Sequence, residues 1–389
     1  MTSKLEELIA EICPNGVEYK KVKDTYLRIK GTPITASKMK EIASEDGEIR
    51  IFAGGKTVIN AHESDIPKAN ITRVPAVLVQ SRGVIDAVYY DKPFTFKNEM
   101  WAYTSNNPIR VKFLYYLLKN NIQYFRDAAS GMGSLPQISL HITEDFEIPV
   151  PPLEVQAEIV RILDTFTELT AELTAELTAR KKQYEYYRDT LLTFDDNNPL
   201  RSLISHYCLN GVEYKKIGDI AFISTGSKLS DIQESPSLYE YINAGTTNSG
   251  YSLDWNCDGD VVTTPSRGQG GIGYVGYQKN KFWLGPLCYK IAGNADFVLN
   301  KYLYYCLSNN SYAILSLKKD GGVPAINKSD LEELVLPVPP LEVQRQIVQI
   351  LDRFDSLCND LTQGLPAEIE ARRKQYEYYR DQLLTFKRA

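Results

Sequence analysis

Long blocks of this 389-residue chain occur twice, and this duplication limits the folds open to it more than any other feature. The block PVPPLEVQAEIVRILDTF at 149–166 returns at 337–354 with fourteen of eighteen positions identical. Two further blocks return in the same way: ARKKQYEYYRDTLLTF at 179–194 and 371–386, and CPNGVEYKKVKD at 13–24, whose second copy is at 208–219. Repeats of this kind indicate a chain built from two related halves.

The repeated blocks alternate with sequence that differs between the halves. Residues 25–147 and 220–335 share only fragments, such as a Ser-Arg-Gly and a later Pro-x-Ile that begins at Pro136 and at Pro324. A chain of this length has room for two or three domains. We therefore divide it into a first domain with an N-terminal constant segment (1–147), a central constant region (148–197), a second domain (198–335) and a C-terminal constant region (336–389).

The central constant region is predicted to form one long helix. Val-Pro-Pro at 150–152 ends the preceding strand, because proline gives no hydrogen bond to a strand ladder. Apolar residues then recur at spacings of three and four, which is the pattern of a coiled-coil seam. The tandem TAELTAEL at 170–177 adds a four-residue insertion that locally unwinds the supercoil. The predicted seam positions are Ile159, Ile162, Phe166, Leu169, Leu173, Leu177, Tyr184, Tyr187, Leu191 and Phe194.

The C-terminal constant region repeats this pattern with four extra residues. Its predicted seam positions are Ile347, Ile350, Phe354, Leu357, Leu361, Arg372, Tyr376, Tyr379, Leu383 and Phe386. Gly364 and Pro366 lie inside the pattern and predict a kink or break there. The two helices are expected to pair with each other in antiparallel orientation, because each ends where a globular segment begins.

The two variable domains both have an α+β pattern. Apolar runs that end at turns predict strands at 49–55, 74–83, 239–245 and 259–268, and helical periodicity predicts helices at 111–125 and 299–315. The glycine-dense stretch 268–276 predicts a loop or hairpin. The predicted fold class is α+β, with two globular domains separated by two long antiparallel coiled-coil helices in a pseudo-two-fold repeat.

Composition excludes several classes of protein. The mean hydropathy is -0.30, and no stretch approaches the ~18 uncharged apolar residues of a membrane span. The first thirteen residues carry three glutamates in place of the apolar core of a signal peptide, so the expected compartment is the cytoplasm. The six cysteines form no Cys-x-x-Cys pair, and the three histidines have no ligand spacing, which excludes a disulfide framework or a zinc knuckle.

No catalytic motif is complete in the sequence. Gly55-Lys56-Thr57 resembles the end of a phosphate-binding loop, but position 50, where the motif requires glycine, is occupied by Arg50. The glycines at 268–273 precede no helical pattern, and both Pro-Pro pairs are followed by leucine where an amino-methyltransferase motif needs an aromatic residue. We expect no chemistry and no bound cofactor or metal on this chain.

Short polar side chains near the predicted turns suit contacts with DNA. Arginine can bind guanine through two hydrogen bonds, glutamine can bind adenine in the same way, and both can contact phosphates. The candidate DNA-binding residues are Lys56, Thr57, Gln80, Ser81 and Arg82 in the first domain, and Thr246, Thr247, Ser266, Arg267 and Gln269 in the second. The alternative is that they are solvated turn residues. Arg82 and Arg267 are favoured because both domains carry them in the same Ser-Arg-Gly.

These residues together resemble one family. The repeated PVPPLEVQ blocks, the TAELTAEL tandem and the repeated QYEYYRD blocks are similar to the specificity subunit of type I restriction–modification systems, and the resemblance covers the whole chain. It implies that each variable domain reads one half of a bipartite, asymmetric DNA site. It also implies that the helices set the spacer between the halves. The interruption at Gly364–Pro366 and the divergence of the domains depart from a uniform pattern.

The resemblance also implies partners. The constant regions would dock two methyltransferase (modification) subunits, and these would recruit the restriction subunits, which act as translocase and nuclease. S-adenosylmethionine, ATP and Mg²⁺ are expected only on those partners. The chain carries a net charge of -5, with 19 basic against 18 acidic residues in 1–147 and 12 against 13 in 198–335. Binding by bulk charge alone is therefore disfavoured, and the partners are expected to supply positive charge around double-stranded DNA.

Two other functions are open to a chain with this pattern. A DNA-modifying enzyme with a fused recognition module would need a methyltransferase or nuclease motif, which the sequence does not contain. A coiled-coil scaffold that binds only protein would account for the constant helices but gives no reason for divergent domains on identical supports.

Overall fold

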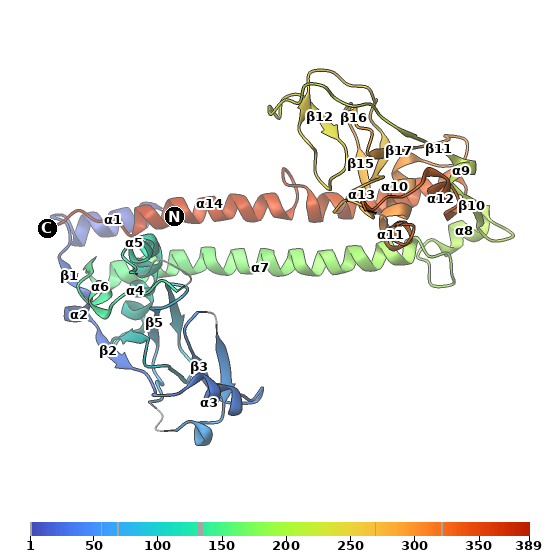
Figure 1. The fold of residues 1–389 in the computed structure, drawn as a ribbon. Helices are drawn as coiled ribbons and strands as arrows, with labels where there is room; N and C mark the ends of the chain where they lie inside the picture. Colours follow the sequence, from blue (N-terminus) through green and yellow to red (C-terminus); the bar gives the residue numbers. More distant parts are fainter. Residues whose placement is uncertain (1, 56, 68–69, 131–134, 269, 320–321) are drawn as a thin grey trace. The chain divides into compact units, whose positions relative to one another are not determined.

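The computed structural model divides into two compact units, each of which mixes helices and strands. It describes residues 2–55, 57–67, 70–130, 135–268, 270–319 and 322–389 (Figure 1). Unit 1 consists of Met1–Leu173 and Ile369–Ala389, and unit 2 consists of Thr174–Glu368. Among the described residues, no helix combines the length and the apolar character that crossing a membrane requires.

Unit 1 contains the first variable domain and parts of two long helices. Its elements are α1 (Thr2–Ile12), β1 (Tyr19–Lys21), α2 (Val22–Thr25), β2 (Leu27–Lys30), α3 (Ala36–Glu41), β3 (Ile49–Phe52), β4 (Val58–Ala61), the 3-10 helix η1 (Glu63–Asp65), β5 (Ala76–Gln80), β6 (Asp86–Tyr90), β7 (Phe94–Phe96), β8 (Trp101–Thr104), α4 (Pro108–Asn120), α5 (Ile122–Asp127), α6 (Leu140–Glu144), β9 (Glu147–Pro149), the first part of α7 (Leu153–Leu191) and most of α14 (Leu365–Leu383).

Unit 2 contains the second variable domain and the remaining helix segments. Its elements are the second part of α7, α8 (Arg201–Tyr207), β10 (Glu213–Lys216), α9 (Ile217–Ile220), β11 (Ala221–Thr225), β12 (Tyr239–Ile242), β13 (Tyr251–Ser252), β14 (Val261–Pro265), β15 (Gly276–Gln278), β16 (Trp283–Leu284), β17 (Cys288–Gly293), α10 (Asn300–Asn309), α11 (Ser311–Ser316), α12 (Lys328–Glu332), β18 (Val335–Val338), α13 (Leu341–Asn359) and the start of α14.

The two units share one strand topology although their variable sequences differ. A four-stranded antiparallel sheet has the order β2-β8-β5-β6 in unit 1 and β11-β17-β14-β15 in unit 2. A three-stranded sheet has the order β4-β3-β7 or β13-β12-β16, with one parallel pair in each. A two-stranded ladder joins β1 to β9 or β10 to β18. The α+β class and the internal repeat are thus confirmed.

The predicted strands form with shorter bounds, whereas each predicted helix is divided into two. All four predicted strands form, as β3, β5, β12 and β14. The predicted helix at 111–125 is two helices, α4 and α5, which meet at Asn121, and the one at 299–315 is α10 and α11, which meet at Asn310. Each asparagine caps the end of the first helix, and the Asn121 side chain bonds to the Leu117 carbonyl at 2.8 Å. Side chains of this type compete with helical hydrogen bonds, which explains the interruption.

The repeated PVPPLEVQ block forms the same helix start twice. Strands β9 and β18 end before the Pro-Pro pair, and α7 and α13 begin at the following leucine. One turn later the side chain of Gln156 donates to the Pro151 carbonyl at 2.7 Å, and Gln344 donates to the Pro339 carbonyl at 2.7 Å. Both glutamines are buried. This bond gives the carbonyl before each helix start a hydrogen-bond donor in both copies, so the repeated spacing within the block has a structural cause.

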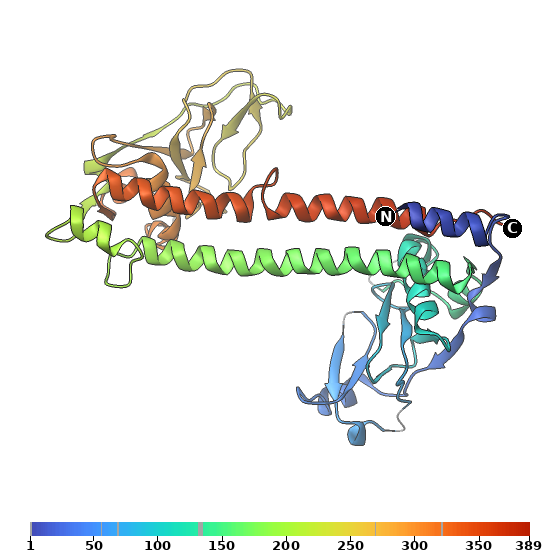
Figure 2. The same cartoon turned by 180° about the vertical axis from the view of Figure 1, so that it is seen from behind.

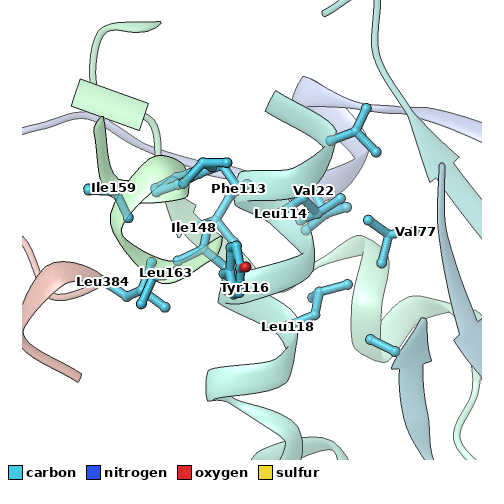
Figure 3. Packing of buried hydrophobic residues seen from close by; sticks show 14 of the residues in the cluster. Val22, Val77, Phe113, Leu114, Tyr116, Leu118, Ile148, Ile159, Leu163 and Leu384 are labelled. Carbon is cyan, nitrogen blue, oxygen red and sulfur yellow. The ribbon is translucent and has the colours of Figure 1, made fainter. Parts of the chain in front are cut away.

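In unit 1, α7 packs against α14 in antiparallel orientation. Leu384 lies beside Ile159 and Leu163 in the buried core (Figure 3). Further along α7, Phe166 stacks on Tyr379 with ring centroids 5.6 Å apart. Residue numbers therefore rise on one helix as they fall on the other. Figures 1 and 2 both show these two helix segments side by side.

In unit 2, α7 packs against α13 through the same residue types. Phe354 stacks on Tyr187 at 5.2 Å and on Tyr184 at 6.3 Å. Leu191 joins the buried core that contains Ile347 and Leu351. The predicted seam tyrosines thus lie in the helix contacts of both units.

The predicted interruption of the C-terminal helix is confirmed, and it makes part of the predicted seam wrong. Helix α13 ends at Asn359 and α14 starts at Leu365. Leu357 is 37% exposed and Leu361 is 79% exposed, whereas Cys358 is fully buried. The backbone N–H groups of Thr362 and Gln363 donate to the Asp360 carboxylate at 2.7 and 3.2 Å. The chain turns here, so a heptad extrapolated across it assigns the wrong residues.

One triad of side chains joins each variable domain to its helix. In unit 1, Tyr116 on α4 donates to Asp164 on α7, and Lys112 lies 2.9 Å from the same carboxylate. In unit 2, Tyr305 on α10 donates to Asp352 on α13 at 2.5 Å, and Lys301 lies 3.6 Å from it. Burial and the hydrogen bond raise the pKa of both tyrosines well above the ordinary value.

Candidate nucleic-acid interface

The Ser-Arg-Gly sequence of the first domain forms a turn held by backbone hydrogen bonds. It follows β5, a strand whose residues are all buried. Segment 136–138 pairs with the turn through two bonds: the N–H of Ile138 donates to the Ser81 carbonyl at 2.9 Å, and the N–H of Gly83 donates to the Pro136 carbonyl at 2.9 Å. Arg82 lies opposite Gln137 in this pairing. Gly83 has φ +78°, a conformation that glycine adopts without strain.

The second domain forms the same turn from a different surrounding sequence. It follows β14 and pairs with segment 324–326 through matching bonds: Ile326 to the Ser266 carbonyl at 2.8 Å, and Gly268 to the Pro324 carbonyl at 3.0 Å. Arg267 lies opposite Ala325. Gly268 also has a positive φ, of +129°. The Ser-Arg-Gly and Pro-x-Ile fragments that the two halves share are therefore the two sides of one structural feature.

A second loop approaches each turn. In the first domain, the loop after β3 bonds to the turn, because the N–H of Gly55 donates to the Arg82 carbonyl at 3.2 Å. In the second domain, the loop after β12 passes close to the turn, since a Cβ added at Gly268 would lie 3.6 Å from the Ala244 carbonyl oxygen. Candidate residues that are distant in sequence are thus brought together within each domain.

The predicted site residues differ in exposure. Thr57, Arg82, Thr246, Thr247 and Arg267 are exposed. Ser81 is fully buried and donates to the Glu99 carbonyl. Gln80 and Ser266 are also buried, at 7% and 8% exposure. These three residues are largely covered by the rest of the chain in this conformation, and their contact with DNA stays a prediction. Lys56 and Gln269 lie outside the described residues.

Sequence reasoning missed the segment that faces each arginine. Gln137 is exposed and occupies the position opposite Arg82, and Ala325 takes the corresponding place opposite Arg267. The shared Pro-x-Ile was visible in both halves, but nothing in the linear sequence showed that it lies against the Ser-Arg-Gly turn. The Ser-Arg-Gly and Pro-x-Ile fragments follow each other in the same order in each half, and this shared order is the signal that could have linked them.

A buried thiol lies next to the second turn. Cys288 lies opposite Pro265 on the neighbouring strand, and burial raises the pKa of its thiol to about 12. It is therefore a protonated thiol at neutral pH and a poor nucleophile. Within the described ranges, no group of three or more His, Cys, Asp or Glu residues is arranged to hold a metal ion. The expectation of no cofactor stays a prediction.

Comparison with known proteins agrees with this arrangement. A family model described as the type I restriction modification DNA specificity domain matches residues 14–180 and again 210–371. The chain is 32% identical over 357 residues to the type I restriction enzyme EcoR124I/EcoR124II specificity subunit of Escherichia coli. This match covers 87% of each chain. It is 29% identical over 313 residues to the type I restriction enzyme MpnII specificity subunit of Mycoplasma pneumoniae, which covers 65% of this chain and 92% of that relative.

A solved structure has the same fold. The type I restriction-modification S subunit from M. genitalium superposes with a TM-score of 0.70 over 95% of this chain and 97% of that one, at 19% sequence identity. The family model covers both repeats, and its matches include each Ser-Arg-Gly turn and the start of each constant helix. The chain belongs to the family of type I restriction–modification DNA specificity subunits.

Proposed function

We propose that this chain selects the DNA site of a type I restriction–modification complex, with each variable domain reading one half of a bipartite, asymmetric site. The observation that carries the proposal is the pair of turns. Two domains of one topology present an exposed arginine on the same backbone frame, while the sequences around it differ. One frame with two sets of side chains suits the recognition of two unlike half-sites.

The long helices set the spacer between the half-sites in this proposal. The tandem TAELTAEL lies inside α7, which is a single helix of 39 residues. Four residues add about 6 Å to a helix, and one base pair adds about 3.4 Å along the duplex. One tetrapeptide therefore corresponds to a change of one or two base pairs.

Catalysis belongs to partner subunits in this proposal. The constant helices dock two methyltransferase subunits, which bind S-adenosylmethionine, and these bring in the restriction subunits with ATP and Mg²⁺. The nearly neutral variable domains support this division, because a protein that holds DNA alone usually carries a basic surface. The partners then supply the remaining positive charge around the DNA.

A methylation map tests this function. The chain is expressed with its methyltransferase subunit in a host without modification, and the genomic DNA is sequenced with detection of modified bases. We expect one asymmetric, two-part motif with an undefined spacer. If the assembled complex leaves the DNA unmethylated, or if the motif is a single continuous sequence, the proposal is wrong, and the scaffold alternative gains support.

Deletion of residues 174–177 tests the role of α7. The deletion keeps both variable domains and the amphipathic pattern, so it should shorten the spacer by one or two base pairs and leave both half-sites unchanged. The readout is the methylation map of the deletion variant. Thr174→Ala, which keeps the helix length, should leave the spacer unchanged. A change in either half-site would contradict the proposal.

A further inference from the structure

Two residues that are identical in both variable domains stand out against the divergence around them. The inference rests on the proposed function, in which the domains read unlike half-sites. A side chain that is the same in both domains, on the same backbone frame, cannot be what makes their half-sites differ. Arg82 and Arg267 are such a pair.

The backbone of each arginine has a structural role, but its side chain has none that the structure shows. The main chain pairs with the opposite segment, which any residue could do. Both side chains are exposed. In the part of the chain that the structure describes, neither guanidinium has a carboxylate within ion-pair distance. Two other arginines of the first domain do form ion pairs: Arg28 lies 3.3 Å from Glu144, and Arg73 lies 2.6 Å from Glu63.

The position opposite each arginine differs between the domains. Gln137 faces Arg82, whereas Ala325 faces Arg267. The loop beside the turn also differs, with Gly-Lys-Thr at 55–57 and Gly-Thr-Thr at 245–247. The constant arginine therefore has different sequence neighbours in the two domains.

Phosphate is the ligand that every DNA sequence offers at the same spacing. Arginine binds phosphate through charge-assisted hydrogen bonds, and contacts of this kind position a protein on DNA without reading its sequence. We infer that Arg82 and Arg267 bind backbone phosphates, one in each half-site, and act as positioning residues, while the side chains around them determine the sequence that is read.

Salt-dependent binding distinguishes this role from base recognition. The complex with methyltransferase subunits is titrated onto three fluorescein-labelled duplexes: the site found by the methylation map, the same site with one half scrambled, and a non-cognate sequence. The variants are Arg82→Ala, Arg267→Ala and Arg82→Lys, each with its methylation map. Gln137→Ala, which keeps the backbone pairing, and Arg201→Ala, which removes a positive charge outside the two turns, are the controls.

We expect each alanine variant to weaken binding to all three duplexes by the same factor, on the order of tenfold, as for the loss of one hydrogen bond to a charged group. The slope of log K against log salt should decrease by about 0.9 for each arginine removed, and the methylated motif should stay unchanged. Arg82→Lys should retain most of the salt slope, because it keeps the charge. Gln137→Ala should leave the non-cognate affinity and the salt slope as they are.

Three results would overturn the inference. A changed motif in one half-site for Arg82→Ala, with unchanged non-cognate affinity, would make Arg82 a base-reading residue. Unchanged affinity for every duplex would remove it from the DNA interface. An equal loss of slope in Arg201→Ala would make the effect one of net charge. A failure of the proposed function looks different, because the methylation map of the unaltered complex would then show no two-part motif.

Discussion

At the scale of single residues, the clearest structural device is the triad that joins each domain to its helix. Tyr116 is 2% exposed and donates a hydrogen bond to Asp164. The Asp164 side chain is 24% exposed and also forms an ion pair with Lys112. The matching Asp352 is 46% exposed. Tyr305 is 1% exposed, so both hydroxyls are equally buried, and the difference lies in the ion pair, which water screens more where the carboxylate is more exposed. The triad of unit 1 should therefore stabilise its unit more than that of unit 2.

Replacement of the aspartates tests this difference. Asp164→Ala should lower the free energy of unfolding of unit 1 by about 1.5–3 kcal/mol, because it leaves Tyr116 and Lys112 without their acceptor. Asp352→Ala should lower the free energy of unfolding of unit 2 by a smaller amount. Hydrogen exchange read separately for α4 and α10 gives both values. The control is Tyr116→Phe combined with Asp164→Ala, which removes the hydroxyl donor together with its acceptor. Equal losses in both units would contradict the argument from exposure.

The candidate site was only partly visible at the residue scale. The repeated Ser-Arg-Gly identified Arg82 and Arg267 as a pair at equivalent turns. The burial of Gln80 and Ser81 was not foreseen, because it depends on β5 being an inner strand of its sheet. An apolar run such as AVLV shows that a strand is buried, but the sequence does not show how many polar residues after the run are buried with it.

At the scale of elements, the break between α13 and α14 depends on one glycine. A Cβ at Gly364 would lie 2.5 Å from the Ser356 carbonyl oxygen and 2.7 Å from that of Asp360. The chain after the break therefore passes directly over the last turn of α13. Gly364 and Pro366 predicted a kink or break here, but only the structure shows the close approach at Gly364.

Gly364→Ala should destabilise unit 2. The added methyl group has no room, and overpacking of this kind costs about 1–3 kcal/mol. The thermal unfolding midpoint of the variant gives the value. Gly270→Ala is the matched control, since a Cβ there meets no atom within 4 Å. An unchanged midpoint for Gly364→Ala would show that the turn can shift without cost.

The seam tyrosines give the helix pairs a dependence on alkaline pH. Burial raises the pKa of Tyr376 from 10.0 to about 12. A group whose pKa is raised by folding stabilises the folded state below its unfolded pKa, and this contribution is lost as the pH rises through the folded value. Unit 1 should therefore lose stability between pH 10 and about 12. Thermal unfolding across this range should show a weaker pH dependence for Tyr376→Phe, and an identical profile would contradict the assignment.

At the scale of the whole molecule, the duplication was predictable but the composition of the units was not. The repeats fixed the number of domains and the similarity of their constant regions. Unit 1, however, combines residues from both ends of the sequence: the N–H of Val17 donates to the Lys387 carbonyl at 2.9 Å, and Arg388 pairs with Glu147. Figure 2 shows α1 beside the last turns of α14. No local pattern reports a contact between residues so distant in sequence. The division at 147, 197 and 335 stays a prediction.

A variant that ends at Glu368 tests the composition of unit 1. It lacks Leu383 and Leu384, which are buried against α7, so the amides around Ile159 and Leu163 should lose their protection from hydrogen exchange. Those around Leu303 in unit 2 should keep it. The substitution Leu384→Ala removes less of this contact and should lower the free energy of unfolding of unit 1 by about 2–5 kcal/mol. Protection that survives in unit 1 of the shortened chain would contradict the division.

The place of residues 369–389 in unit 1 also determines the order in which the protein is completed on the ribosome. Unit 2 is one continuous stretch, Thr174–Glu368, and all its parts are made before the segment that closes unit 1. During translation, Ile159 and Leu163 leave the exit tunnel long before Leu383 and Leu384 are synthesised to cover them. Nascent chains with uncovered apolar surface are prone to aggregation and are bound by chaperones. The domain that is made first is therefore the last to receive all of its residues.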